Sequence, residues 1–186
     1  MPKLRTLIAW LFSASLLCSC NVSCSVGDKK STDKSNTSVK SSVAVKNGAT
    51  ITNNIELDSK GLKISSATLS LENGNRVADD NVVKLNEKIY LRIHVDSGWT
   101  NINGKSYIGA SEKIETDGGD LIISAEDIFK DYNETGFSSA DAKDVSLSAI
   151  ITSTKPGIKY FLVSYRVWDK KSNAELSGQY KFYIKE

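Results

Sequence analysis

Cysteine is absent from most of this sequence, and its absence excludes several kinds of chemistry. The three cysteines are Cys18, Cys20 and Cys24, so residues 25–186 contain none. That part of the chain therefore has no disulfide, no thiolate nucleophile and no cysteine-ligated zinc site. The single histidine is His94, and a lone histidine on the outward row of a strand is more often a solvated surface residue than a catalytic or metal-binding one.

Proline and concentrated positive charge are also scarce. The 186 residues include 2 prolines and 12 glycines, which excludes a collagen-like chain. The 24 lysines and arginines nearly balance the 22 aspartates and glutamates, for a net charge of +2. Because nucleic-acid binding needs a strongly basic face, we expect no nucleic-acid partner.

Motifs of the common enzyme classes are missing as well. There is no Gly-x-Ser-x-Gly motif and no glycine-rich phosphate loop ahead of a helix. We therefore expect no enzymatic activity and no cofactor; the alternative left open is a small hydrolase that uses two carboxylates in a concave cluster around His94. Acidic turns offer oxygen ligands for calcium, but Asp and Asn are ordinary turn residues, so we assign no metal ligands. These turns hold Asp79-Asp80-Asn81, Asp117 with Asp120, and Asp141 with Asp144.

The N-terminus has the features of an export signal. Lys3 and Arg5 precede residues 7–17, eleven residues without a charge. A basic start, a short apolar stretch and small residues after it are typical of a secretory signal, and the stretch is too short to cross a bilayer as a helix. We therefore expect residues 1–19 to be a signal peptide.

The end of this segment, Leu17-Cys18-Ser19-Cys20, resembles the lipobox of bacterial lipoproteins. The resemblance implies that Cys20 becomes the first residue of the mature chain and carries fatty acids such as palmitate, which attach it to a lipid membrane. Two or more acyl chains anchor a protein durably, since each buried CH₂ contributes about 0.8 kcal/mol. Asn21 follows Cys20, and lipoprotein sorting rules then imply the bacterial cell envelope, at the outer membrane. The fate of Cys24 is left open.

A spacer follows the lipobox. Residues 25–40 are mainly Ser, Thr, Asn, Asp and Lys, a composition that buries too little apolar surface to offset chain entropy. We therefore predict a disordered, lipidated linker over residues 20–54 and a folded domain over residues 55–186. A hairpin of residues 43–45 and 49–51 around Lys46-Asn47-Gly48 is the alternative for part of the linker.

From residue 62 onward, apolar residues alternate with polar ones at the period of a β-strand. A change of parity near Ser65 predicts a bulge, Gly178 predicts a close approach of the backbone, and residues 124–127 predict one capped helical turn. Residues 117–120 predict a hairpin turn. The predicted inward rows are Ile89, Leu91, Ile93, Val95; Val145, Leu147, Ala149, Ile151; Phe161, Val163, Tyr165, Val167; and Leu176, Tyr180, Phe182, Ile184. Seven to eight short strands with almost no helix predict an all-β fold, an antiparallel β-sandwich.

The segment from Lys155-Pro156-Gly157 through Tyr160 to Trp168 resembles the corner and penultimate strand of immunoglobulin-like and fibronectin type III-like domains. The resemblance implies an immunoglobulin-like sandwich. It also implies that Tyr160 is the corner tyrosine, whose hydroxyl binds back to the preceding loop. A shared fold does not define a function.

Loop aromatics provide the remaining functional signal. Trp99 lies at a predicted strand end, Tyr107 in a glycine-rich polar loop and Tyr132 just after the predicted helical turn. At such positions rigid rings can anchor a protein partner or stack on a sugar. The alternative is that Trp99 and Trp168 cap the ends of the core. We predict a membrane-anchored, non-enzymatic module for protein binding or envelope assembly, with a carbohydrate-binding module based on Trp99 and Tyr107 as the alternative.

Overall fold

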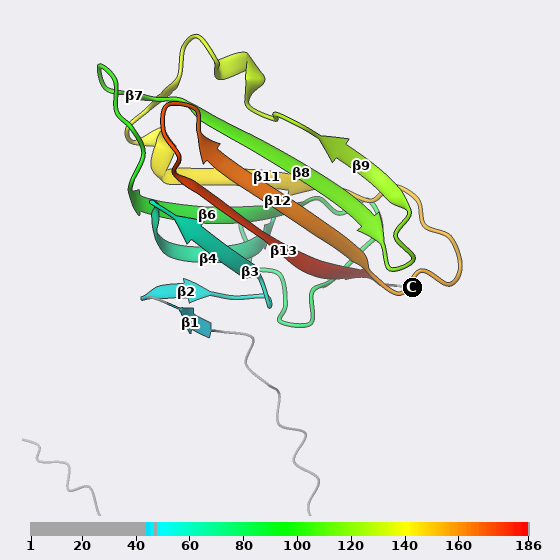
Figure 1. The fold of residues 1–186 in the computed structure, drawn as a ribbon. Coiled ribbons are helices and arrows are strands. Elements are labelled where there is room, and N and C mark those ends of the chain that lie inside the picture. The colour runs from blue at the N-terminus through cyan, green and yellow to red at the C-terminus, as the bar shows by residue number, and fades with distance from the viewer. Residues whose placement is uncertain (1–43, 47, 186) are drawn as a thin grey trace, which may run out of the picture. The chain divides into compact units, whose positions relative to one another are not determined.

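The chain forms two β-sheets (Figure 1), and the apolar rows of the sequence form the core between them. The computed structural model describes residues 44–46 and 48–185, which lie within one compact unit, Val39–Glu186. In that described part of the chain, no helix has the length and apolar character needed to cross a membrane.

The first sheet has five strands. In spatial order they are β1 (Ala44–Lys46), β2 (Ala49–Ile51), β4 (Lys63–Leu71), β6 (Ile89–Ser97) and β11 (Asp144–Ala149). Neighbouring strands are antiparallel except β2 and β4, which are parallel. Parallel neighbours need a crossover connection, and here the chain leaves the first sheet to form β3 (Glu56–Lys60) in the second before it returns as β4.

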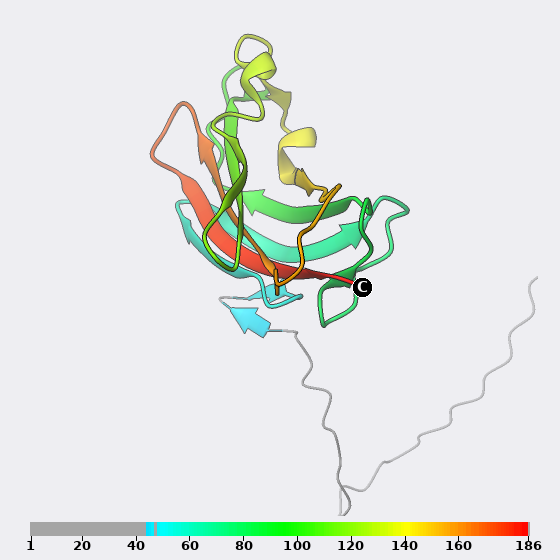
Figure 2. The same ribbon diagram turned by 90° about the vertical axis from the view of Figure 1, so that its right-hand side faces the viewer.

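The second sheet faces the first across the core. In spatial order its strands are β3, β13 (Glu175–Ile184), β12 (Phe161–Asp169), β8 (Ile108–Thr116) and β9 (Leu121–Ala125), and the short β5 (Val82–Val83) pairs in parallel with the end of β13. Figure 2 shows the two sheets as two layers, with β12 (orange) and β13 (red) in the second and β4 (teal) and β6 (green) in the first. The loops add a two-stranded sheet of β7 (Lys105–Ser106) and β10 (Phe137–Ser138), and two short 3-10 helices, η1 (Lys130–Tyr132) and η2 (Asp141–Lys143).

The predicted fold class is confirmed: the described residues form a β-sandwich, in which eight strands have five or more residues. Of the sixteen predicted inward residues, fifteen are buried and Ile184 packs partly exposed against the core. Local predictions hold too. The bulge falls between Ile64 and Ser66, and the turn after Thr116 joins β8 and β9, with the Thr116 N–H donating to the Asp120 carbonyl oxygen. At Gly178 an added Cβ would lie 1.9 Å from the Glu56 carbonyl oxygen.

The predicted start of the folded part needs correction. The alternative hairpin forms, since β1 pairs with β2, and Ala49 and Ile51 are buried in the core. Asn53, inside the predicted linker, is fully buried and donates from Nδ2 to the Val77 carbonyl oxygen. Tertiary contacts with β4 thus order residues 49–53, which the sequence had placed in the linker. The signal peptide, Cys20 and most of the linker lie outside the described residues.

Two further local predictions differ from the structure. Ser124 and Ala125 belong to β9, and the short helix begins later, at Lys130. Asp127 is the residue that shapes the turn, because its Oδ1 accepts the N–H of Phe129 at 3.1 Å.

The corner tyrosine is also placed differently. The ring of Tyr160 lies edge-on to Tyr183, with the Lys181 ammonium 4.4 Å from its centroid. The tyrosine that ties distant backbone together is Tyr165, whose hydroxyl donates to the Glu56 carbonyl oxygen at 2.8 Å. Tyr165 points into the sandwich, where a long side chain can reach from β12 past β13 to β3.

Candidate functional site

The loops bring the three predicted aromatic residues to one end of the sandwich, but in different roles. Trp99 packs against the core, and its indole N–H donates to the Ala142 carbonyl oxygen at 2.8 Å. Because the ring of Trp99 packs on the core and its nitrogen is hydrogen-bonded, Trp99 caps the end of the core. This is the structural alternative to a binding role that the sequence left open. Trp168 lies instead on the outer face of β12, where it covers Gly109 and stacks with the Arg166 guanidinium at 5.0 Å.

Of the other two rings, Tyr107 is half-buried and Tyr132 is exposed. Tyr107 carries the Lys171 ammonium 4.7 Å from its ring centroid. Tyr132 is 48% exposed and stacks on Phe137 at 4.5 Å between centroids. Trp99 and Tyr107 are thus a core cap and a ring covered by a lysine, so they do not form the open stacking platform that a sugar needs.

His94 has acidic neighbours on the outer face of the first sheet. Its Nδ1 lies 2.6 Å from Asp144 Oδ1, and its Nε2 lies 3.9 Å from Asp96 Oδ1. Ser66 is the cross-strand neighbour of His94 on β4, but no hydrogen bond joins the two among the described residues. The two acids that a hydrolase requires around His94 are therefore present, on a surface where the Asp144 side chain is 75% exposed.

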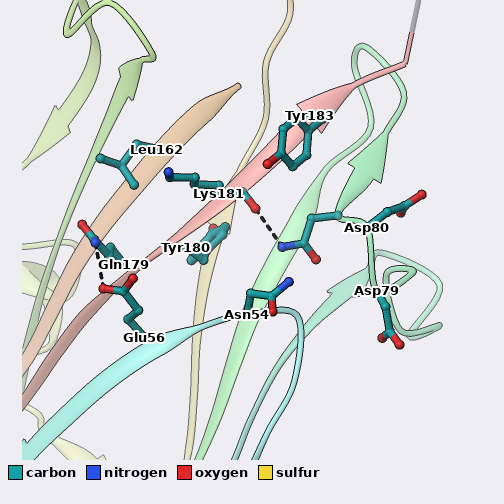
Figure 3. A pocket seen from close by; sticks show the side chains of 10 residues that line it. Asn54, Glu56, Asp79, Asp80, Leu162, Gln179, Tyr180, Lys181 and Tyr183 are labelled. Carbon is teal, nitrogen blue, oxygen red and sulfur yellow. Dashed lines mark hydrogen bonds between the residues drawn. The ribbon is translucent and has the colours of Figure 1, made fainter. Parts of the chain in front are cut away.

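A polar pocket of about 470 Å³ lies at the edge of β13, between β3 and the loop before β5 (Figure 3). Glu56 Oε2 accepts a hydrogen bond from Gln179 Nε2 at 2.7 Å on one side, and Asp79 and Asp80 lie on the other. Tyr183 supplies a partly exposed aromatic wall. Carboxylates and amides beside an aromatic ring match the chemistry of a polyhydroxylated ligand.

The loop that bounds this pocket is rigidly held. Asn81 is buried, and its Nδ2 donates to the backbone oxygens of Asn53 and Lys181, each at 2.8 Å. Asn53 returns a hydrogen bond from its own Nδ2 to Asn81 Oδ1 at 2.9 Å. Reciprocal amide bonds of this kind fix a loop against a sheet edge.

The edge strands of the two sheets differ in how they are protected against pairing with another chain. On β3 the exposed positions include Glu56, Asp58 and Lys60, and on β11 the apolar side chains are buried while Asp144 and Ser148 face solvent. Charged or polar residues on an edge discourage pairing with another chain. These two edges follow that rule.

The edge of β9 does not follow it. β9 pairs with β8 on one side only, and lies at the rim of the sheet in Figure 1. Its residues Leu121, Ile122 and Ile123 are 59%, 45% and 41% exposed, and the strand carries no charge. Three consecutive exposed aliphatic residues on an open edge are a site where another chain can pair. The sequence predicted the strand but could not show that it lies at an edge.

One buried carboxyl lies on the strand next to β9. Glu112 of β8 points inward, is 6% exposed, and its Oε1 has no hydrogen-bond partner among the described residues. Burial raises the pKa of Glu112 to about 7, because the charged form is poorly solvated there. Glu112 lies two residues before the buried Ile114 on β8. That spacing places both side chains on the same face of the strand and was the signal in the sequence for the inward position of Glu112.

Two tyrosines on the inner face of the second sheet, Tyr165 and Tyr180, also have raised pKa values. Burial, together with the nearby Glu112, raises the pKa of Tyr180. Burial, with smaller contributions from Asp58 and Glu56, raises the pKa of Tyr165. The inner face of the second sheet thus favours the uncharged forms of these three groups.

Comparison with known proteins gives little further information. No family model matches the chain, and no curated protein matches it. Among solved structures, it is similar to the C-terminal domain of wzt, with a TM-score of 0.45 and 9% identity over 71% of this chain and 78% of that one. Similarity at this level carries no conclusion about function, so the functional argument rests on the residues themselves.

Proposed function

We propose that this protein is a lipid-anchored, non-enzymatic binding module that captures an extended segment of a partner protein along the open edge of β9. The observation that carries the proposal is the exposure of Leu121, Ile122 and Ile123 on an uncharged edge strand. Strand addition to such an edge gains backbone hydrogen bonds and buries apolar side chains together. Each half-exposed aliphatic side chain that becomes buried adds on the order of 1 kcal/mol.

The anchor in this proposal is Cys20. Its support is the lipobox resemblance of residues 17–20, which also implies the outer membrane of a bacterial envelope. Mass spectrometry of the natural protein tests this part. We expect a mature chain that begins at an acylated Cys20 and a Cys20→Ala variant that is neither acylated nor held at the membrane. An unprocessed first methionine contradicts it.

Site-specific photo-crosslinking in the cell tests the binding edge. A photoreactive amino acid replaces Ile122 in one variant and Ser148, on the polar edge of β11, in the matched control. We expect a discrete crosslinked polypeptide from position 122 and none from position 148. Crosslinks of equal yield from both positions, or from neither, would refute β9 as the binding edge.

A second candidate function is carbohydrate binding in the polar pocket of Figure 3. The observation that favours it is the combination of Tyr183 with Glu56 and Gln179 around a volume that suits one or two sugar rings. A glycan array distinguishes the two functions. Strong binding that is lost in Tyr183→Ala, and retained in Ile122→Asp, would favour the carbohydrate function.

A further inference from the structure

We infer that the occupant of the β9 edge is an extended protein segment with an apolar centre and a basic residue at each end. This inference rests on the proposed function, since it names the partner of the same edge. It starts from the residues that bound the strand. Asp120 comes immediately before Leu121, Glu126 comes immediately after Ala125, and both acidic residues are exposed.

The strand offers both backbone and side-chain contacts. In an antiparallel pair, alternate residues turn their N–H and C=O groups to opposite sides, so about half of these groups on β9 face away from β8. Leu121 lies opposite Glu115, and Ile123 lies opposite Ile114. Because these partners point to opposite faces of β8, β9 exposes apolar surface on both faces, which a segment with apolar residues at consecutive positions can cover.

A second copy of this chain fits the edge poorly. If two copies of β9 pair antiparallel about Ile123, Asp120 of each copy lies opposite Glu126 of the other. If they pair in parallel, Asp120 lies beside Asp120 and Glu126 beside Glu126. Like charges directly opposite each other destabilise a strand pair. The register shift at Ile122 further interrupts a regular ladder between identical strands.

Charge complementarity instead favours a partner with lysine or arginine at both ends. The neighbouring Asp127 is already engaged, because its Oδ2 accepts a hydrogen bond from Lys170 Nζ at 2.6 Å. Glu126 is therefore the carboxylate presented at that end, and Asp120 is its counterpart at the other. Since both ends are acidic, a basic-flanked segment is accepted in either direction, and electrostatic attraction also speeds its encounter with the edge.

Two synthetic peptides test this inference. Both have a centre of consecutive Val residues, and one carries lysines at its two ends where the other carries glutamates. Their binding to the purified mature protein in detergent is measured by fluorescence anisotropy. At low salt we expect the lysine-flanked peptide to bind at least about tenfold more tightly, with the ratio falling severalfold near 1 M salt. Combining Asp120→Lys with Glu126→Lys should reverse the preference.

The controls separate the failure of this inference from the failure of the proposed function. Ile122→Asp should abolish binding of both peptides, whereas Ser148→Lys on the edge of β11 should not, with thermal unfolding used to verify that each variant folds. Equal binding of both peptides that is lost in Ile122→Asp overturns the basic-flank inference but keeps β9 as the binding edge. No binding of either peptide overturns the inference, and crosslinking at position 122 then decides the proposed function. A dimer that Ile122→Asp dissociates also overturns it, because a second copy is then the occupant.

Discussion

The buried carboxyl of Glu112 makes the stability of the domain depend on pH. Burial raises the pKa of Glu112 from 4.5 to about 7 in the folded state, whereas the unfolded chain keeps the ordinary value. Below pH 4.5 the group is protonated in both states, so its ionisation costs no stability there. As the pH rises toward 7, the unfolded state releases the proton first, so stability is lost over that interval. A pKa difference of this size between the two states lowers the free energy of unfolding by about 3 kcal/mol, at 1.36 kcal/mol for each pKa unit.

The perturbation that tests this reasoning is Glu112→Gln, which keeps the shape of the side chain and removes its charge. We expect the variant to be close to wild type in stability near pH 4.5, and more stable by about 3 kcal/mol near pH 8.5. The assay is urea unfolding of the unacylated chain, followed by tryptophan fluorescence, across this pH range. Glu126→Gln, at an exposed loop position, is the matched control and should leave the pH profile of unfolding unchanged. If wild type and Glu112→Gln show the same profile, the carboxyl is not desolvated as described.

Four other predictions follow from individual contacts. Gly178→Ala should destabilise the domain by about 3 kcal/mol, because the added Cβ meets the backbone of β3; Gly118→Ala, whose Cβ would meet only an ordinary contact at 3.6 Å, should have little effect in the same unfolding assay. Asn53→Ala should lower the free energy of unfolding by about 3 kcal/mol or more, since it leaves several buried backbone groups without hydrogen-bond partners. Burial opposes ionisation of Asp169, but hydrogen bonds from the backbone N–H groups of Thr100 and Lys171 outweigh it and lower the pKa. Asp169→Asn should therefore reduce stability at neutral pH, and the loss should shrink as the pH falls below 3.8. His94→Ala should change stability by less than about 1 kcal/mol and leave ester and glycoside hydrolysis at background; a hydrolytic activity of the wild type that this variant loses would favour the hydrolase alternative.

Several elements were predictable because their causes are local. The row from Ile89 to Val95 follows from strict alternation, and the turn between β8 and β9 follows from its paired glycines and aspartates. Gly178 was expected to mark a close approach, and the backbone of the neighbouring β3 does lie where its Cβ would be. Local signals failed where distant contacts decide. Asn53 lies within the predicted linker range, yet its amide joins β4 to the loop before β5.

The candidate site was only partly predictable for the same reason. Trp99 and Tyr132 were recognisable as loop aromatics, but whether a ring packs inward or faces solvent depends on what lies beside it. His94 was expected on an outward row, while its contact with Asp144 depends on the pairing of β6 with β11, fifty residues later in the chain. The apolar character of residues 121–123 was visible in the sequence, and their exposure was not.

Alone, the sequence determined the period of two that makes strands, the turns that separate them, the inward rows, and the lipobox-like segment at the N-terminus. These features depend on neighbouring residues and need no distant partner. The tertiary structure decided which strands end the sheets, and therefore that β3 and β11 are polar edges while β9 is an apolar one. Strand order is set by pairings between segments far apart in the chain, and an edge exists only once every other strand has found its neighbour.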